Sequence, residues 1–325
     1  MMAEPLFSLF GFPVTAYALC VALAALLSTL LLPVAARREK VSSATAEWFA
    51  WLAVALGVFF AHALYSLMQL PDILAEYGAL FIVNPTRGGF MVYGAMIGIA
   101  LAALLAARWT KGNARAVLDA ALPAGALFLA LCRFAEFFDG QGYGMQVDET
   151  PGLCFFPLSF QNEYGEWYLA IFLFEGLFAL GLCLWAVLDK RARPAGKKAV
   201  LFLILYAASQ TLFETLRRDQ VIKWGFIRVS QLISVLVLAA VLLIGQLAAQ
   251  KKRGFWRTAG AWLLFIVLTG ACVGLEFTVD KPIPIGDTLL YLPYWLTYLL
   301  IGLCAAGMGT LSYRAVTARR RPRIG

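Results

Sequence analysis

The sequence predicts an all-α, polytopic membrane protein, and two of its properties lead to this fold class. Of its 325 residues, 62% are hydrophobic and only 14% are charged, whereas soluble domains average about 25% charged residues. The chain also contains repeated apolar stretches of about 18 residues or more, each long enough to cross a bilayer as a helix. Most of the chain is therefore expected to lie in a membrane.

Nine apolar stretches are predicted to be transmembrane helices. The first ends in Arg37-Arg38-Glu39-Lys40 and follows a start with no positive charge, so we interpret it as a retained helix and not as a signal peptide. The nine expected helices are 14–35, 46–69, 89–107, 117–138, 167–188, 199–216, 228–249, 258–277 and 288–312.

The distribution of basic residues predicts the orientation of these helices. The connections after the odd-numbered helices, together with the C-terminal tail, carry 20 of the 27 Lys and Arg residues. Because cytoplasmic loops are enriched in Lys and Arg, the N-terminus is expected outside and the C-terminus in the cytoplasm. The net charge of +8 is thus interpreted as a topology signal, and no nucleic-acid partner is expected.

Seven basic residues fall on the other side or inside a helix. Arginine matches the geometry of phosphate oxygens, so cations near the outer headgroups suit an anionic phosphate. For Lys223 and Arg228 a second interpretation stays open, in which surface side chains extend to the interface. The seven residues are Arg87, Arg133, Arg217, Arg218, Lys223, Arg228 and Lys281.

Residues 128–144 combine the end of an apolar stretch with a polar, glycine-rich turn. Arg133, Glu136 and Asp139 are spaced by three, which places them near one face of a helix. Ionisable side chains in hydrocarbon are costly and either pair with each other or mark a substrate path. Both interpretations apply to Arg133 and Glu136. Glu175 lies in the middle of the fifth helix and needs a partner, for which Arg133 and a tyrosine hydroxyl are the candidates.

Two further segments carry candidate residues. The connection 139–166 has 28 residues, no Lys or Arg, and many Gly, Pro and aromatic residues, so it is long enough to form a lid or a substrate-binding loop. In the sixth helix, Gln210, Glu214 and Arg217 follow one another at spacings that place them on one face.

These segments together resemble the prolipoprotein diacylglyceryl transferase family, a family of seven-helix bacterial inner-membrane enzymes. The run from Cys132 to Gly144 is similar to the family signature Gly-Arg-x-Gly-Asn-Phe-x-Asn-x-Glu-x-x-Gly, with Arg133 and Gly144 at matching positions. The run that begins Gly88-Gly89 and continues through Tyr93-Gly94 is similar to Gly-Gly-x-x-x-His-Gly-Gly-x-x-Gly. The resemblance covers residues 1–250 and implies a seven-helix core there, whereas residues 251–325 look like an added transmembrane hairpin with a basic cytoplasmic tail.

The resemblance implies a set of site residues. As catalytic residues it suggests Tyr93, Arg133, Glu136, Asp139 and Glu214. As substrate-binding residues it suggests Tyr17, Gly88, Gly89, Gly94, Gly144, Tyr206, Gln210, Arg217 and Arg218. No metal and no cofactor are expected.

The chain also departs from the family pattern. Tyr93 stands where the family has an important histidine, and Gln210 stands where it has an arginine in the sixth helix. The single histidine, His62, lies near a family arginine that is replaced by Ala63. Since a phenol is a weak base at neutral pH, Glu136 is the better candidate for the proton acceptor.

The family resemblance implies transfer of a diacylglyceryl group from phosphatidylglycerol to the lipobox cysteine thiol of a prolipoprotein in the bacterial inner membrane. Its partners would be phosphatidylglycerol or a similar anionic phospholipid and a prolipoprotein signal peptide. The lost histidine and arginines favour an alternative, a paralogue that binds phospholipid or lipopeptide without transfer. A small transporter is a third possibility, although the sequence shows no inverted repeat or paired broken helices.

The orientation can be tested with reporter fusions. Because the basic residues lie on one side, fusions placed after Arg257 and after Arg323 should both report the cytoplasm. A periplasmic signal from either fusion would contradict the predicted topology.

Overall fold

The computed structural model describes residues 5–9, 12–84, 88–191, 193–219, 221–225, 227–248, 254–280, 283–285, 288–290 and 292–317. Several basic residues used in the predictions above lie outside these ranges, namely Arg87, Lys251, Lys252, Arg253, Lys281, Arg319, Arg320, Arg321 and Arg323.

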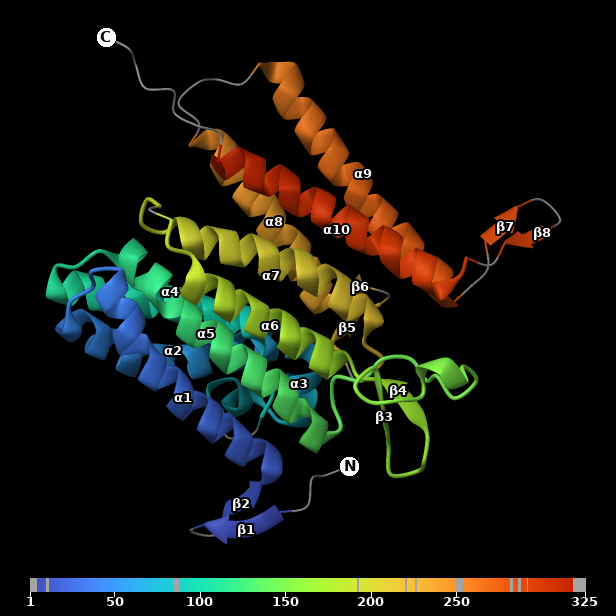
Figure 1. The fold of residues 1–325 in the computed structure, drawn as a ribbon, viewed down its shortest axis with the longest axis horizontal. Coiled ribbons are helices and arrows are strands. Elements are labelled where there is room, and N and C mark those ends of the chain that lie inside the picture. The colour runs from blue at the N-terminus through green and yellow to red at the C-terminus, as the bar shows by residue number, and fades with distance from the viewer. Residues whose placement is uncertain are drawn as a thin grey trace. The chain divides into compact units, whose positions relative to one another are not determined.

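Within the described residues, nine helices are long and apolar enough to cross a membrane, which confirms the predicted fold class. Short elements precede or connect them, among them α3 (Leu70–Glu76) and four two-stranded antiparallel hairpins. The nine long helices are α1 (Ala16–Arg38), α2 (Ser43–Met68), α4 (Val92–Thr110), α5 (Ala114–Ala135), α6 (Ile171–Leu188), α7 (Lys197–Leu216), α8 (Val229–Leu247), α9 (Phe255–Asp280) and α10 (Tyr294–Thr317) (Figure 1). The hairpins are β1–β2 (Pro5–Leu9 and Phe12–Thr15), β3–β4 (Ser159–Gln161 and Trp167–Leu169), β5–β6 (Lys223–Trp224 and Ile227–Arg228) and β7–β8 (Ile283–Ile285 and Thr288–Leu290).

Helices α6 and α10 begin four and six residues later than predicted, because short strands precede them. Helix α6 begins at Ile171 and not at 167, since Trp167–Leu169 pairs with Ser159–Gln161 as an antiparallel hairpin. Helix α10 begins at Tyr294 and not at 288, since Thr288–Leu290 forms strand β8. A short apolar run fits a strand as well as a helix by its pattern alone. The long connection before α6 therefore contains folded structure and not only irregular loop.

Among the described residues, the chain forms two compact units. Unit 1 contains residues 1–199 and 218–222, and unit 2 contains residues 200–217 and 223–325. Unit 1 thus holds α1 to α6, and unit 2 holds α7, apart from its first turn, and α8 to α10. The boundary expected near residue 250 concerns the family resemblance and stays a prediction.

In unit 1, α2 packs along α4, and α5 lies between α1 and α6 (Figure 1). Small residues permit these close contacts. A Cβ atom at Gly94 of α4 would lie 2.2 Å from the carbonyl oxygen of Phe60. A Cβ atom at Gly176 of α6 would lie 2.2 Å from the ring of Phe134 on α5. Gly94 therefore has a clear packing role, while its expected role in substrate binding stays a prediction.

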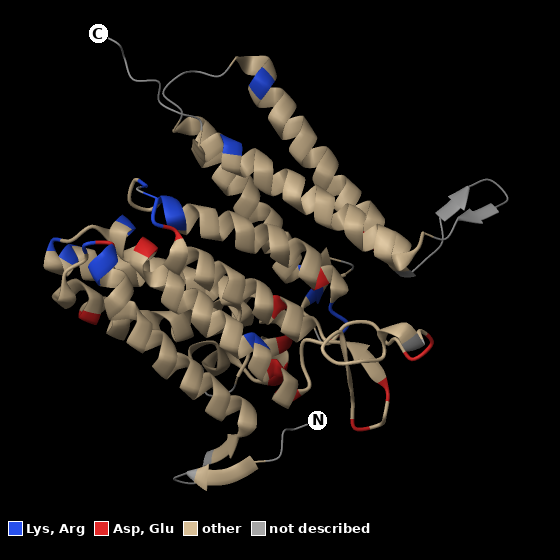
Figure 2. Ribbon diagram, viewed as in Figure 1, with Lys and Arg blue, Asp and Glu red and all other residues tan. Residues whose placement is uncertain are grey.

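Basic residues of unit 1 gather at one end of its long helices. Figure 2 shows this concentration where α1 meets α2 and where α4 meets α5. The residues include Arg37 and Arg38 in the last turn of α1 and Arg108 in the last turn of α4. Cations in the last turn of a helix also interact favourably with its dipole. The same basic residues were used above to predict the orientation of the helices. The side of the membrane on which they lie stays a prediction.

At the same end of unit 1, a buried aspartate holds the segment that leads into α7. Asp119 of α5 is only 4% exposed. Its Oδ2 accepts a hydrogen bond from the N–H of Gly196 at 2.7 Å, and its Oδ1 accepts one from Ala199 at 2.8 Å. The first N–H groups of a helix have no partner inside the helix, so Asp119 caps the start of α7 from another helix.

Unit 2 has its own apolar core. Side chains of α7, α8, α9 and α10 meet there, with Leu238, Ile301 and Met308 completely buried. The hydroxyl of Ser312 on α10 donates to the carbonyl oxygen of Leu238 on α8 at 2.8 Å. The C-terminal hairpin of α9 and α10 therefore packs as an integral part of this unit.

Replacement of Asp119 by alanine should destabilise the protein. The change removes a charged acceptor from two backbone N–H groups, at an expected cost of about 2 kcal/mol or more. Thermal unfolding of the purified protein in detergent measures the effect, with the exposed Asp72→Ala as the control. Equal melting temperatures for the two variants would show that the cap contributes nothing.

Candidate functional site

Arg133 lies in the last turn of α5, and two carboxylates contact its guanidinium group. Nη1 of Arg133 donates to Oε1 of Glu136, which follows one turn later. Nε of Arg133 lies 2.7 Å from Oε2 of Glu175 on α6. The Glu175 side chain is only 1% exposed, and the other two are 11% exposed. Arg133, one of the two candidates from the sequence, is therefore a partner of Glu175.

This Arg133 cluster, formed by Arg133, Glu136 and Glu175, has more acid than base. With all three groups ionised it carries a net charge of −1. Buried charges require compensation by partners or protons. An approaching anion would meet two carboxylates as well as one guanidinium.

The turn after α5 is built around a glycine that touches the Arg133 cluster. Gly142 has a φ of 71°, in the left-handed region, and a Cβ atom here would lie 2.5 Å from Oε2 of Glu136. Its N–H donates to Oδ2 of Asp219 at 2.8 Å, and its carbonyl accepts from the N–H of Phe172 at 2.7 Å. The turn thus connects the end of α5 with the start of α6. The sequence analysis missed Asp219, because its partner lies 77 residues away.

Gly144 and Arg218 lie next to this turn. The N–H of Gly144 donates to the carbonyl of Leu169 at 2.8 Å, and a Cβ atom at Gly144 would lie 2.8 Å from the side chain of Ile171. The backbone N–H of Arg218 donates to the carbonyl of Tyr143 at 2.9 Å. Both residues thus have structural contacts, and their expected roles in substrate binding stay predictions.

Tyr17 and Asp139 belong to the surroundings of the Arg133 cluster. Tyr17, near the start of α1, is half-buried and interacts electrostatically with Glu136, Asp139 and Arg133. Asp139 accepts a hydrogen bond from the side chain of Gln141 at 2.7 Å. The structure therefore brings together four of the residues predicted for the site.

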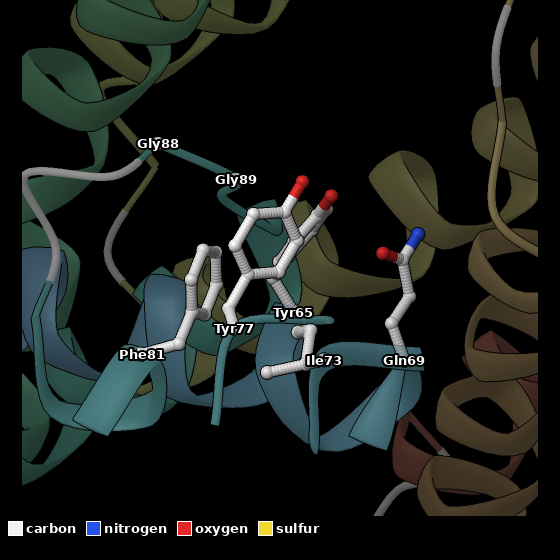
Figure 3. A pocket seen from close by; sticks show the side chains of 7 residues that line it. All are labelled: Tyr65, Gln69, Ile73, Tyr77, Phe81, Gly88 and Gly89. Atoms are coloured by element: carbon white, nitrogen blue, oxygen red, sulfur yellow. The ribbon is translucent and has the colours of Figure 1, made fainter. Parts of the chain in front are cut away.

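The Gly88-Gly89 pair borders a cavity of about 380 Å³. Gly88 and Gly89 have φ values of 80° and 79°, so the chain turns here and α4 begins at Val92 instead of 89. Figure 3 shows the hydroxyl groups of Tyr65 and Tyr77 pointing to the same side of this cavity. The cavity is lined by Tyr65, Gln69, Ile73, Tyr77, Phe81, Gly88 and Gly89.

The single histidine contacts two backbone carbonyl groups beside this cavity. His62 on α2 is 1% exposed. Its Nδ1 lies 3.0 Å from the carbonyl oxygen of Gly89, and its Nε2 lies 2.7 Å from that of Phe81. Both neighbours are acceptors, so a neutral imidazole donates to one of them and a doubly protonated ring donates to both. Tyr93, at the second position of α4, is also buried, with 6% exposure.

The other predicted site residues lie in unit 2, on one face of α7 and, for Arg217, directly after its end. Tyr206, Gln210, Glu214 and Arg217 are all at most 7% exposed. The ring of Tyr206 is stacked parallel to Phe202, with 6.1 Å between ring centroids. The expected spacing on one face is therefore present, and the face is buried in the protein.

Arg228 does not lie on the surface, and the interpretation of it as an exposed interfacial residue is wrong. It is 6% exposed, and its Nε donates to Oε1 of Glu276 on α9 at 2.9 Å. Its Nη1 donates to the carbonyl oxygens of Glu214 at 2.5 Å and Arg217 at 2.9 Å. Lys223, in strand β5, is exposed as that interpretation expected.

An exposed carboxylate stabilises the hairpin in the long connection before α6. Oδ1 of Asp148 accepts from the backbone N–H of Trp167 at 2.9 Å, and Oδ2 accepts from the side chain of Gln146 at 2.6 Å. These bonds, first that from Trp167, lower the pKa of Asp148 below its ordinary value.

Among the described residues, no group of three or more His, Cys, Asp or Glu side chains is arranged so that it could hold a metal ion. The nine candidate spans among the described residues define a multi-pass membrane protein. The ion pair of Arg133 and Glu175 is buried between two of these helices.

Comparison with known proteins gives the family. A family model described as prolipoprotein diacylglyceryl transferase matches residues 4–246. This is well over half of the chain, which therefore belongs to the prolipoprotein diacylglyceryl transferase family. Helices α9 and α10 lie beyond the matched range.

Two similar proteins are phosphatidylglycerol–prolipoprotein diacylglyceryl transferases. The one from Streptococcus pneumoniae serotype 4 is 27% identical over 245 residues, which are 74% of this chain and 92% of the relative. The one from Clostridium botulinum strain Hall is 29% identical over 177 residues, which are 53% of this chain and 69% of the relative.

The Asp148 contacts predict a pH-dependent hairpin. Because the pKa of Asp148 is lowered in the folded protein, its stabilisation is complete above the ordinary Asp pKa of about 3.9 and is lost as the pH falls through the lower folded value. Hydrogen exchange at the Trp167 amide, corrected for the intrinsic rate, should therefore accelerate in that acid range.

Asp148→Asn should remove most of this pH dependence, and the exposed neighbour variant Glu149→Gln should keep it. An acid transition that survives in Asp148→Asn would assign the effect to another group.

Proposed function

We propose that this chain transfers a diacylglyceryl group from phosphatidylglycerol to the cysteine thiol of a prolipoprotein in the bacterial inner membrane. The observation that carries the proposal is the buried Arg133 cluster, in which a potential proton acceptor contacts the arginine at the family's motif position. Phosphatidylglycerol and prolipoprotein are the substrates in the names of the similar proteins. The concentration of basic residues in one set of connections supports an N-terminus outside and a C-terminus in the cytoplasm.

The reaction needs a proton acceptor and a group that stabilises a phosphate. The cysteine thiol gives its proton to Glu136, because the thiolate is the reactive nucleophile. The sulfur then forms a bond to the glyceryl carbon that carries the phosphate ester. The carbon–oxygen bond breaks, and its electron pair leaves with the oxygen of glycerol phosphate. The products are a thioether and a phosphate monoester with one more negative charge.

Proton transfer to Glu136 would also prepare Arg133 for that new charge. Once Glu136 is neutral, its attraction for the guanidinium weakens, and the net charge of the cluster rises from −1 to zero. Arg133 then stabilises the departing phosphate by charge and hydrogen bonding. The contact of Glu136 with Nη1 and of Glu175 with Nε supports this division, since Glu175 keeps the side chain oriented while Glu136 changes charge.

The remaining residues receive supporting roles in this proposal. Tyr93 orients the headgroup through its hydroxyl, and the cavity beside Gly88 and Gly89 has space and polar groups for part of a substrate. Asp139 and Glu214 are assigned to the charged surroundings of the reaction. Substrate contacts are assigned to Tyr17, Gly94, Gly144, Tyr206, Gln210, Arg217 and Arg218.

A second candidate function is the binding of phospholipid or lipopeptide without transfer. Tyr93 and Gln210 replace the family's histidine and arginine, and two carboxylates already occupy Arg133. These features would leave lipid binding possible while removing catalytic power.

Incubation of the purified protein with labelled phosphatidylglycerol and a lipobox peptide separates the two functions. Transfer of label to the peptide is expected for the wild type. Glu136→Gln should reduce turnover about 100-fold or more, because it removes the proton acceptor, and should leave lipid binding.

Arg133→Lys should weaken lipid binding, since lysine lacks the planar fork. Tyr93→Phe should cost about 1.5–3 kcal/mol of binding or transition-state stabilisation.

The exposed variant Glu47→Gln serves as the control for loss of a carboxylate. Normal turnover by Glu136→Gln would refute the assignment of the proton acceptor. Lipid binding without transfer by the wild type would favour the second candidate function.

A further inference from the structure

Helices α9 and α10 lie outside the part of the chain that matches the family, yet they are tied to it by charge as well as by apolar packing. The connection is made by Arg228, the residue before α8, and Glu276 of α9. The two residues are 48 positions apart in the sequence.

Arg228 completes the end of α7. The last carbonyl groups of a helix have no partner inside the helix, and a cation at this end is favoured by the helix dipole. Nη1 of Arg228 occupies this position, because it donates to the carbonyl of Glu214 at 2.5 Å and to that of Arg217 at 2.9 Å. Both residues belong to the site assigned above.

Glu276 makes this arrangement of Arg228 possible. A buried guanidinium is strongly unfavourable without a carboxylate partner, and Nε of Arg228 lies 2.9 Å from Oε1 of Glu276. The helix that carries Glu276 is itself held by the unit 2 core. Its side chain Trp262, for example, donates to the side chain of Gln246 on α8 at 2.9 Å.

We infer that Glu276 is a positioning residue of the transferase: through Arg228 it fixes the end of α7, and with it Glu214 and Arg217. The C-terminal hairpin thus holds residues of the site in position, in addition to crossing the membrane. This inference rests on the proposed function for its consequence in catalysis, but its structural part can be measured independently.

The test compares Glu276→Leu with Glu276→Asp and with the control Glu47→Leu, which makes the same replacement at an exposed position of α2. Glu276→Leu should raise KM for phosphatidylglycerol and lower kcat, by roughly 10–100-fold in kcat/KM, because small displacements of site residues have effects of this size. Glu276→Asp should recover part of the loss, and Glu47→Leu should show none.

The double variant Arg228→Met/Glu276→Leu separates positioning from stability. It leaves no unpaired buried charge, so its melting temperature should lie above that of Glu276→Leu. Its kcat/KM should nevertheless stay low, because the hydrogen bonds from Arg228 to the carbonyls of Glu214 and Arg217 are lost. Activity that recovers together with the melting temperature would overturn the positioning role.

Hydrogen exchange distinguishes failure of this inference from failure of the proposed function. Faster exchange of the amides from Phe213 to Arg217 in Glu276→Leu, relative to Glu47→Leu, supports the inference even if the wild type transfers no lipid. An unchanged rate overturns it. An active wild type with a fully active Glu276→Leu variant would likewise overturn the inference while leaving the proposed transfer intact.

Discussion

The cost of placing charge among apolar helices determines how this protein is assembled. Where water is absent, a guanidinium needs carboxylate or carbonyl acceptors supplied by the protein. Arg133 in unit 1 and Arg228 in unit 2 both meet this requirement with acceptors from a different helix, Glu175 for the first and Glu276 for the second. Each arginine consequently fixes a helix end, because it lies at the last turn of α5 or beside the last turn of α7. The ionic contacts and the helix packing are therefore parts of one arrangement.

The proposed chemistry depends on the same shortage of solvent. Two carboxylates contact the one guanidinium group of Arg133. Glu136 is the more exposed of the two at 11%, while Glu175 is 1% exposed. In the proposed mechanism the less deeply buried Glu136 takes the proton, and Glu175 maintains the position of the arginine. An unequal environment gives two chemically identical groups different roles.

The sequence predicts the elements that depend on composition and local spacing, and it fails where distant residues meet. The nine long helices found in the described part of the chain follow from the length of the apolar stretches, and the common face of Gln210, Glu214 and Arg217 follows from the period of the helix. The burial of Arg228 does not follow, because Glu276 reaches it from 48 residues away. The strands before α6 and α10 were missed because their aromatic and apolar side chains satisfy a helical pattern equally well. A family resemblance adds roles to residues but no contacts between them.

The position of His62 has a consequence for chemical labelling. Its two ring nitrogens face carbonyl oxygens of the segment that bounds the Tyr65 cavity, and its ring is completely enclosed. A reagent selective for imidazole would therefore have to open this segment before it reacts. Any inactivation by such a reagent would report the local opening of the glycine turn and not the loss of a proton carrier. Because the chain has one histidine, the rate at which the imidazole is modified measures how often the segment before α4 separates from α2.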